Sequence, residues 1–184
     1  MIDLRKHYIK ILFLAGVILL ILSSIWIIVN LNSNSELTTT IKMLNDDNYY
    51  SGVGEAVRNS KEYIHIVVFG GTYQEDTDVE KLFDDLEAAA ERGVTVKIVF
   101  DEGWEKITYT AVELKSRGAD VRFDNKERTT HAKFIVIDGE IVIIGSTNWS
   151  EAAMQKNHEA NVLIHSTELA KDYEDYFEDI WDGN

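Results

Sequence analysis

The sequence predicts an α/β fold in which helices flank a mixed β-sheet. Short runs of β-branched and other apolar residues alternate with segments whose apolar positions repeat at helical spacing. Two of the apolar runs are joined by a two-residue turn sequence, which is typical of a β-hairpin. The chain of 184 residues shows no internal repeat, and its length suits one such domain with an appended segment.

The first elements of the domain carry signals of unequal strength. Residues 37–44 have a weak strand pattern, and residues 50–60 place their apolar side chains on one helical face, although two glycines weaken this helix. Residues 63–69 form an apolar, β-branched strand that ends at Gly70 and Gly71. These glycines favour a turn over a phosphate cradle, because no Walker A sequence or complete dinucleotide fingerprint surrounds them.

Two further helix–strand units are expected next. Residues 77–80 match a capping box and open a helix that ends at Gly93, and residues 94–100 form a buried strand. Residues 108–117 form a second helix, and residues 119–123 form a short strand. The side chains that this second helix should turn inward are Ala111, Val112 and Leu114.

The carboxy-terminal part of the chain predicts three more elements. Residues 150–155 form a short helix, residues 160–165 a strand, and residues 167–181 an amphipathic, acidic helix. The side chains that the last helix should turn inward are Leu169, Tyr173, Tyr176, Phe177 and Ile180.

The expected hairpin lies between residues 131 and 148. Its strands are the β-branched runs 134–137 and 141–144, and Asp138 with Gly139 forms the tight turn between them. His131 and Lys133 are two positions apart, so they point to the same face of an extended strand. Ser146 and Asn148 follow the second strand with the same parity. Because a hairpin brings its ends together, these four side chains should meet at one end of the sheet.

The four side chains of this group suit a phosphate ligand. Lys133 supplies a point charge, while Ser146 and Asn148 supply neutral donors. His131 could attack phosphorus or move a proton near neutral pH. The group is a poor metal site, because hard cations require several oxygen ligands.

The same residues carry a resemblance to a known family. His131, Lys133 and Asp138, followed by Gly145-Ser146 and Asn148, resemble the HxK-x4-D-x6-GSxN signature of the phospholipase D superfamily. Every defined position of that signature is present. The resemblance extends over residues 50–181 and is to small members with one signature per chain, which include bacterial endonucleases and cardiolipin-hydrolase-like proteins. It implies a phospholipase D-like fold for the domain.

The resemblance also implies a mechanism with two histidines. One histidine forms a covalent phosphohistidine, and the other protonates the leaving oxygen and then activates water. Because His131 is the only histidine here in such a motif, a homodimer with a shared site is implied. Lys133 and Asn148 would then hold the phosphoryl oxygens with support from Ser146. No metal and no organic cofactor would be required.

The resemblance and the strand pattern assign roles to the remaining candidates. Asp138 should have a structural role, ordering the turn with Gly139 and pairing nearby cations, and Gly145 belongs to the structural part of the motif. Glu159 matches the acidic residue that in small family members bonds one imidazole nitrogen of the catalytic histidine.

Two other histidines are not expected in the site. His158 is next to Glu159, but on a strand it faces the opposite way, so we expect a surface residue. His65 falls in an apolar strand and is expected to be a hydrogen-bonded core histidine.

The amino-terminal segment predicts a membrane anchor. Nineteen residues from Ile11 to Val29 carry no charge, and as a helix they would span about 28 Å. The segment exceeds the usual length of a signal-peptide core, and no A-x-A-like cleavage site follows it. Arg5, Lys6 and Lys10 precede it, so the amino terminus should be cytoplasmic and the domain extracytoplasmic. The expected organisation is an anchor over residues 1–30, a linker with a possible edge strand over 31–49, and a phosphodiesterase domain over 50–184.

Charge bears on the class of substrate. The chain has a net charge of −14, and residues 1–35 carry three basic side chains and one acidic one, which leaves −16 on the rest. Such a domain is repelled by phosphate backbones and by anionic lipid surfaces, so a broad nucleic-acid-binding surface is disfavoured. A small basic cleft is still possible, because the densest basic cluster surrounds His131: Arg122, Lys126, Arg128 and Lys133.

Several functions remain open from the sequence. The first is a membrane-anchored phosphodiesterase acting on phospholipid or on nucleic acid, with a slight preference for a lipid or a small diester. The second is a non-catalytic, membrane-tethered binding module, and the third is a phosphatidyltransferase in which an alcohol replaces water. The chain contains no cysteine, which excludes disulfides, thiolate metal sites and a cysteine nucleophile.

Overall fold

The computed structural model describes residues 4–33, 39–104, 107–124 and 128–183, without the side chains of residues 4–7, 11 and 27–33. The chain divides into two compact units, Met1–Leu37 and Thr38–Asn184. The boundary expected at residue 50 therefore lies inside the second unit, which already contains the first strand of the sheet.

The described part of the first unit is one long helix, α1 (Leu4–Ser33). Within it, the 19 residues Tyr8–Trp26 have a mean hydropathy of 2.4, and none of that stretch is buried. By length and composition this stretch is a candidate membrane span, although a signal sequence close to an amino terminus has the same character. The expected apolar helix is thus confirmed, while its fate and orientation stay predictions.

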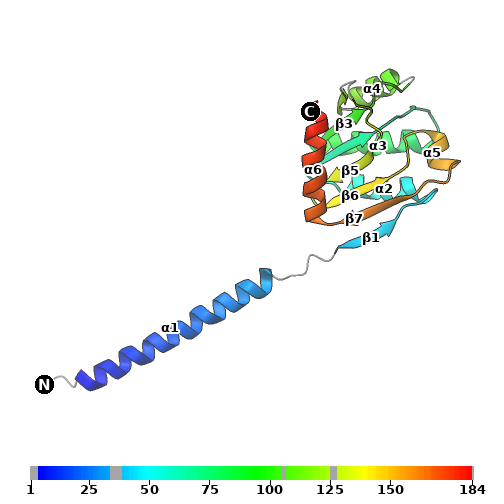
Figure 1. The fold of residues 1–184 in the computed structure, drawn as a ribbon. Coiled ribbons are helices and arrows are strands. Elements are labelled where there is room, and N and C mark those ends of the chain that lie inside the picture. The colour runs from blue at the N-terminus through cyan, green and yellow to red at the C-terminus, as the bar shows by residue number, and fades with distance from the viewer. Residues whose placement is uncertain (1–3, 34–38, 105–106, 125–127, 184) are drawn as a thin grey trace. The chain divides into compact units, whose positions relative to one another are not determined.

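The second unit is built on a mixed seven-stranded sheet, which confirms the expected fold class (Figure 1). The strand order across the sheet is β1-β7-β6-β5-β2-β3-β4. Strands β2, β3 and β4 pair in parallel, and all other neighbours pair antiparallel. The strands are β1 (Thr40–Met43), β2 (Tyr63–Val68), β3 (Thr95–Phe100), β4 (Asp120–Phe123), β5 (Lys133–Ile137), β6 (Ile141–Gly145) and β7 (Asn161–His165).

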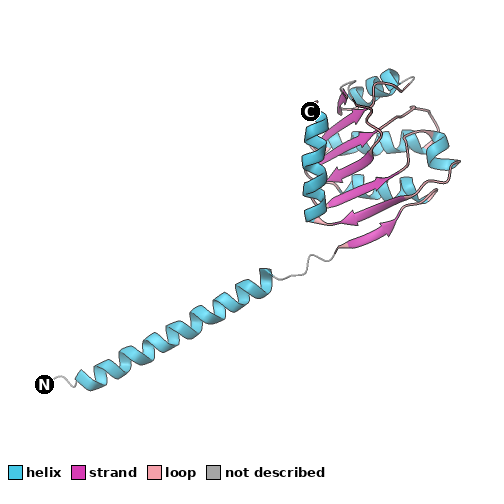
Figure 2. Cartoon of the chain, in the orientation of Figure 1, coloured by secondary structure: helices cyan, strands magenta, loops and turns pink. Residues whose placement is uncertain are grey.

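Helices cover both faces of this sheet (Figure 2). Along β2 the side chains alternate, so that Ile64 and Ile66 join the larger hydrophobic core and Val67 joins the smaller one. The larger core is closed by four helices, and the smaller one is closed by α6 (Thr167–Trp181). The four helices are α2 (Asn48–Asn59), α3 (Asp78–Glu91), α4 (Ile107–Ser116) and α5 (Glu151–Gln155).

The turn between β5 and β6 is the one the sequence predicts. Asp138 and Gly139 have φ angles of 53° and 63°, and the Glu140 N–H donates to the Ile137 carbonyl at 3.0 Å. Two successive positive φ angles define a type I′ turn, whose right-handed twist matches that of a hairpin. Glycine suits the second position because it has no Cβ to oppose a positive φ.

The hydrogen bonds of the capping box predicted for the start of α3 do not form, so this prediction is wrong. Thr77 occupies the N-cap position, but its hydroxyl donates to the Gln74 carbonyl at 2.7 Å rather than accepting a helix N–H. Glu80 accepts the Asp76 N–H at 2.8 Å instead of the N–H of Thr77. Asp76 has a φ of 58°, and this left-handed turn brings its N–H within reach of the glutamate.

Two expected inward side chains point outward. Val112 is 59% exposed because α4 packs through Ile107, Ala111 and Leu114, which lie at i, i+4 and i+7 and leave Val112 on the outer face. Tyr176 is 46% exposed, although its ring stacks on Phe134 with 5.7 Å between centroids.

Candidate active site

One end of the sheet collects the polar residues of the motif. At this end β2 and β6 finish, while β5 and β7 begin, as the pairing of Val68 with Lys133 and of Gly145 with Asn161 shows. The antiparallel hairpin therefore brings the residues before β5 next to the residues after β6. The position of the group agrees with the expectation from the hairpin.

His131 and Lys133 form the centre of the group. The Lys133 ammonium lies 3.2 Å from Nδ1 of His131 and donates to the His131 carbonyl at 2.6 Å. An ammonium has no lone pair, so Nδ1 is the acceptor in this contact and a neutral ring then carries its proton on Nε2. The His131 side chain is exposed and accessible to a substrate.

Lys133 is an ammonium with little water around it. The residue is 9% exposed, and burial lowers its pKa below the ordinary lysine value of 10.5, while the charge of Glu159 acts in the opposite direction. A desolvated cation interacts more strongly with phosphoryl oxygens than a hydrated one does. Lys133 is therefore suited to bind an anionic substrate.

One aromatic side chain contacts His131 from the side and a second one supports it, and the sequence analysis missed both. The Phe69 ring lies 4.6 Å from the imidazole, and its centroid is 5.1 Å from the Lys133 ammonium. Trp104 packs edge-on against Phe69 at 5.4 Å. The available signal was an aromatic residue at the carboxyl end of a strand, which also fits an ordinary core position.

Ser146 and Glu159 interact with each other. The Ser146 hydroxyl donates to the Glu159 carboxylate and accepts the Ala160 N–H at 3.1 Å. The other carboxylate oxygen of Glu159 accepts from Asn157 at 3.0 Å. Within the described part of the chain no hydrogen bond joins Glu159 to His131, so the expected carboxylate–imidazole contact is not formed within one subunit.

Asn148, two residues after Ser146, has an unsatisfied amide oxygen. Its Oδ1 atom is buried and has no hydrogen-bond partner among the described residues. Such an atom costs free energy until a ligand or another chain supplies a donor. Because the oxygen and nitrogen of an amide can exchange places by rotation, the same group can also present its NH₂ to a phosphate.

The loop after β2 fixes the segment that carries Asn148. The Trp149 N–H donates to the Gly70 carbonyl at 3.0 Å, and the Thr72 N–H donates to the Trp149 carbonyl at 2.7 Å. The indole of Trp149 is 1% exposed in the larger core. Gly70 therefore serves as part of a turn that aligns the site, in agreement with the sequence.

Asn161 is a further residue that the sequence analysis missed. It is 4% exposed and binds the Thr147 hydroxyl at 2.8 Å and the Leu44 carbonyl at 3.1 Å. A Cβ atom at Gly145 would lie 2.1 Å from Oδ1 of Asn161, so only glycine allows β7 to approach here. The signal in the sequence was an asparagine at the start of an apolar strand, two residues after Glu159.

Asp138 lies at the other end of β5 and has a structural position. Its carboxylate accepts three consecutive backbone N–H groups, those of Lys61, Glu62 and Tyr63, at 2.9, 2.8 and 3.0 Å. The carboxylate thus joins the hairpin turn to the start of β2. The hydrogen bonds described for the Asp138 carboxylate are to backbone N–H groups, and none of them is to the nearby cations that we expected it to pair with.

The remaining candidates lie apart from the motif. His158 is fully exposed with Asp46 as its partner, and His65 is a buried, hydrogen-bonded histidine, as expected for both. The basic cluster is dispersed, since Arg122 stacks on Trp181 at 3.9 Å and Lys126 lies outside the described residues. A pocket of about 180 Å³ opens beside His131, and its lining includes Arg128, Asp124, Asp179, Tyr176 and Ile180.

Comparison with known proteins decides the family. A family model described as cardiolipin synthase, PLD-like domain, matches residues 53–181. This chain belongs to the phospholipase D superfamily. The match runs from within α2 to the end of α6, covers every strand of the sheet except β1 and includes every residue of the motif, so the domain is a phospholipase D-like phosphodiesterase domain by family.

Individual relatives of this phospholipase D-like chain agree with the family match. The mitochondrial cardiolipin hydrolase of Xenopus tropicalis is 34% identical over 91 residues, which is 49% of this chain and 43% of that protein. The chain thus aligns with less than half of that relative. The phospholipase D family member Nuc from Salmonella typhimurium superposes with a TM-score of 0.70 at 27% identity, covering 79% of this chain and 95% of that one. NucT from Helicobacter pylori, at 19% identity and a TM-score of 0.64, shares the fold.

Proposed function

We propose that this protein hydrolyses a phosphodiester bond through a covalent phosphohistidine at His131. The observation that carries the proposal is the exposed imidazole in contact with a buried ammonium, two residues away on the same strand end. Asn148 adds an unsatisfied amide at the same end of the sheet. An imidazole with two anion-binding groups suits attack on phosphorus.

The proposed reaction has two steps. An imidazole nitrogen attacks phosphorus, the phosphorus–oxygen bond to the leaving group breaks, and a second imidazole donates its proton to the leaving oxygen. The second imidazole then removes a proton from water, and the resulting hydroxide displaces the histidine from phosphorus. Lys133 and Asn148 hold the non-bridging oxygens throughout, and Ser146 positions Glu159.

The second imidazole in this proposal comes from another copy of the chain. Within one subunit a single His131 lies beside Lys133, whereas the proposed reaction needs a nucleophilic imidazole and a proton-donating imidazole at the same phosphate. A two-fold contact between hairpin ends would place His131 of the partner subunit across the phosphate. The same contact would bring a hydrogen-bond donor to the buried Oδ1 atom of Asn148.

The substrate class follows from charge and from the candidate span. The −16 carried by residues 36–184 disfavours long polyanions, and an anchored domain would stay close to phospholipid head groups. We therefore favour a phospholipid or a small diester, as the name of the Xenopus relative suggests. Nucleic acid is the alternative, because the short single-signature members that the sequence resembles include endonucleases.

The proposed organisation places this activity at a membrane. Residues 1–30 serve as a cytoplasmic stub and an uncleaved anchor, and residues 31–49 connect it to the domain as linker and edge strand. Three basic residues before Ile11 favour a cytoplasmic amino terminus and an extracytoplasmic phosphodiesterase domain, whose compact unit begins at Thr38 rather than at the expected residue 50.

A substrate panel tests the proposed activity. The full chain in detergent is assayed against phosphatidylcholine, cardiolipin, single-stranded DNA and bis(p-nitrophenyl) phosphate, with and without a chelator. We expect chelator-insensitive cleavage of at least one substrate and a loss of about 10²-fold or more in His131→Ala. The matched control is His158→Ala, whose side chain is exposed and paired with Asp46, and it should keep full activity. No cleavage of any substrate would refute the proposal.

Trapping the intermediate tests the chemistry. Rapid mixing with substrate, an alkaline quench that preserves the phosphorus–nitrogen bond, and mass spectrometry should locate a phosphoryl adduct on His131. Finding this adduct excludes a non-catalytic binding module. Turnover that occurs only with added ethanol or glycerol, with no hydrolysis in its absence, would assign the protein to the phosphatidyltransferases instead.

A further inference from the structure

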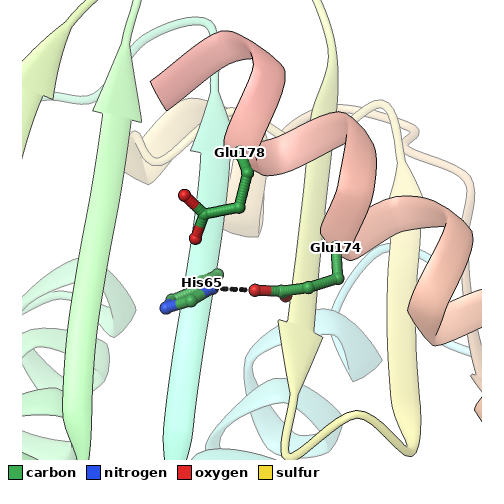
Figure 3. A group of neighbouring side chains, drawn as sticks. All are labelled: His65, Glu174 and Glu178. Carbon is green, nitrogen blue, oxygen red and sulfur yellow. Dashed lines mark hydrogen bonds and ion pairs between the residues drawn. The ribbon is translucent and has the colours of Figure 1, made fainter. Parts of the chain in front are cut away.

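A second polar cluster lies under α6, on the face of the sheet that carries the smaller core. His65 projects from the middle of β2, and its side chain is 7% exposed. Its Nδ1 atom lies 2.6 Å from a carboxylate oxygen of Glu174. Glu178 is one helical turn further along α6, and its carboxylate lies on the same side of the ring (Figure 3).

The geometry of this cluster suits a shared ligand. One nitrogen of His65 and one oxygen each of Glu174 and Glu178 lie within 4.8 Å of one another. The second oxygen of Glu174 is buried and has no hydrogen-bond partner among the described residues. A carboxylate oxygen in that state is costly, and a cation bound between the three groups would satisfy it.

We propose that His65, Glu174 and Glu178 bind a divalent transition-metal ion, with Zn²⁺ as the best match. A nitrogen ligand with two carboxylates suits zinc, whereas Mg²⁺ and Ca²⁺ prefer oxygen ligands alone. The site is separate from the group around His131, because His65 pairs with Val136 towards the end of β5, whereas Lys133 pairs with Val68 at the start of that strand.

Lys97 is the neighbouring charge that the site must accommodate. Its ammonium lies 3.1 Å from one oxygen of Glu178 and 5.1 Å from the centroid of the Trp181 ring. That ion pair engages a single oxygen of Glu178, so the second oxygen is left for the metal. Lys97 would then orient a ligating carboxylate, as outer-shell partners of metal sites commonly do.

A metal at this position would clamp α6 to the sheet. In the described part of the domain α6 is the helix that closes the smaller core, and Tyr176 and Ile180 of α6 line the pocket beside His131. The ion would therefore stabilise the wall of the catalytic pocket without contacting the substrate. This inference does not depend on the proposed chemistry of His131.

Metal uptake by the full chain tests the site. The protein, purified in detergent without a histidine tag and stripped with a chelator, is titrated with Zn²⁺ by calorimetry, desalted and analysed for bound metal. We expect one zinc per chain, a higher Tm with Zn²⁺, and no such change with Mg²⁺. Glu178→Gln should weaken zinc binding by about 10-fold or more. Because Glu178 is 42% exposed, this variant should fold even where a substitution of His65 does not.

Two control variants separate this site from other histidines. His131→Ala and His158→Ala should both bind zinc with wild-type stoichiometry and affinity. Absence of zinc uptake by the wild type, or equal uptake by the wild type and Glu178→Gln, would overturn the proposal. In that case the cluster is an ion pair between His65 and Glu174 alone.

Discussion

At the scale of single residues, alternation along a strand explains the core of the site. His131 and Lys133 share a face because they are two positions apart, and the hairpin brings Ser146 and Asn148 to the same end. The sequence was sufficient to predict that these four residues lie at one end of the sheet. It was not sufficient for Phe69 or for the bonding of Glu159, because both depend on which segments pack together across the end of the sheet.

The buried ammonium of Lys133 leads to a prediction on pH dependence. Its pKa is lowered from 10.5 by burial, so the charge is present below the lowered pKa and is lost as the pH rises through it. Since only the charged form holds phosphoryl oxygens, we expect kcat/KM to fall on the alkaline side before pH 10.5. A pH profile of kcat/KM measures this, because it reports the groups of the free enzyme.

The control for the alkaline limb is Lys133→Arg. A guanidinium stays charged throughout the accessible range, so the limb should move to higher pH even if the maximum rate is lower. An unchanged limb in Lys133→Arg would show that another group, such as a tyrosine, is responsible.

At the scale of elements, the β5–β6 hairpin separates the end that carries the proposed catalytic residues from a structural end. His131 lies before the first residue of β5, and Asp138 directly follows the last of its five residues. The type I′ turn and both strands could be predicted because turn chemistry and β-branched runs are local signals. The bonding at the start of α3 could not, because it depends on the left-handed conformation of Asp76, which is a property of the preceding loop.

Asp138→Ala should therefore lower stability and spare activity. Three backbone N–H groups lose their acceptor, and we expect the free energy of unfolding to fall by about 1–3 kcal/mol. Urea denaturation followed by circular dichroism measures the change, and kcat of the folded variant should stay within about 2-fold of the wild type.

A matched control for this substitution is Asp175→Ala. Its side chain is 72% exposed and pairs with Lys171 at 3.7 Å, so the expected change is below about 0.5 kcal/mol. Loss of activity in Asp138→Ala without loss of stability would instead give this carboxylate a part in the chemistry.

At the scale of the whole molecule, a mixed sheet with helices on both faces presents one motif at one of its ends. The fold class could be predicted because strands and helices alternate clearly along the chain. The extent of the compact unit could not, since within the weak pattern of residues 37–44 the strand β1 forms only by pairing with β7, more than a hundred residues later. Long-range pairing of that kind leaves little trace in the local sequence.

One motif per chain makes assembly the central claim of the proposed mechanism. A single subunit holds one imidazole in contact with Lys133, and the two-step reaction uses two. If the second imidazole comes from a partner subunit, a dimer with one inactive subunit cannot complete the reaction. If the subunits act independently, the intact subunit of such a dimer keeps its own activity.

The most direct measurement is the activity of mixed dimers. Wild type and His131→Ala are produced together in equal amounts, and the activity is measured per total protein. We expect about a quarter of the wild-type value, because about one dimer in four then has two intact subunits. A value of about half, or full activity from a protein that stays monomeric, would contradict a site shared between two chains.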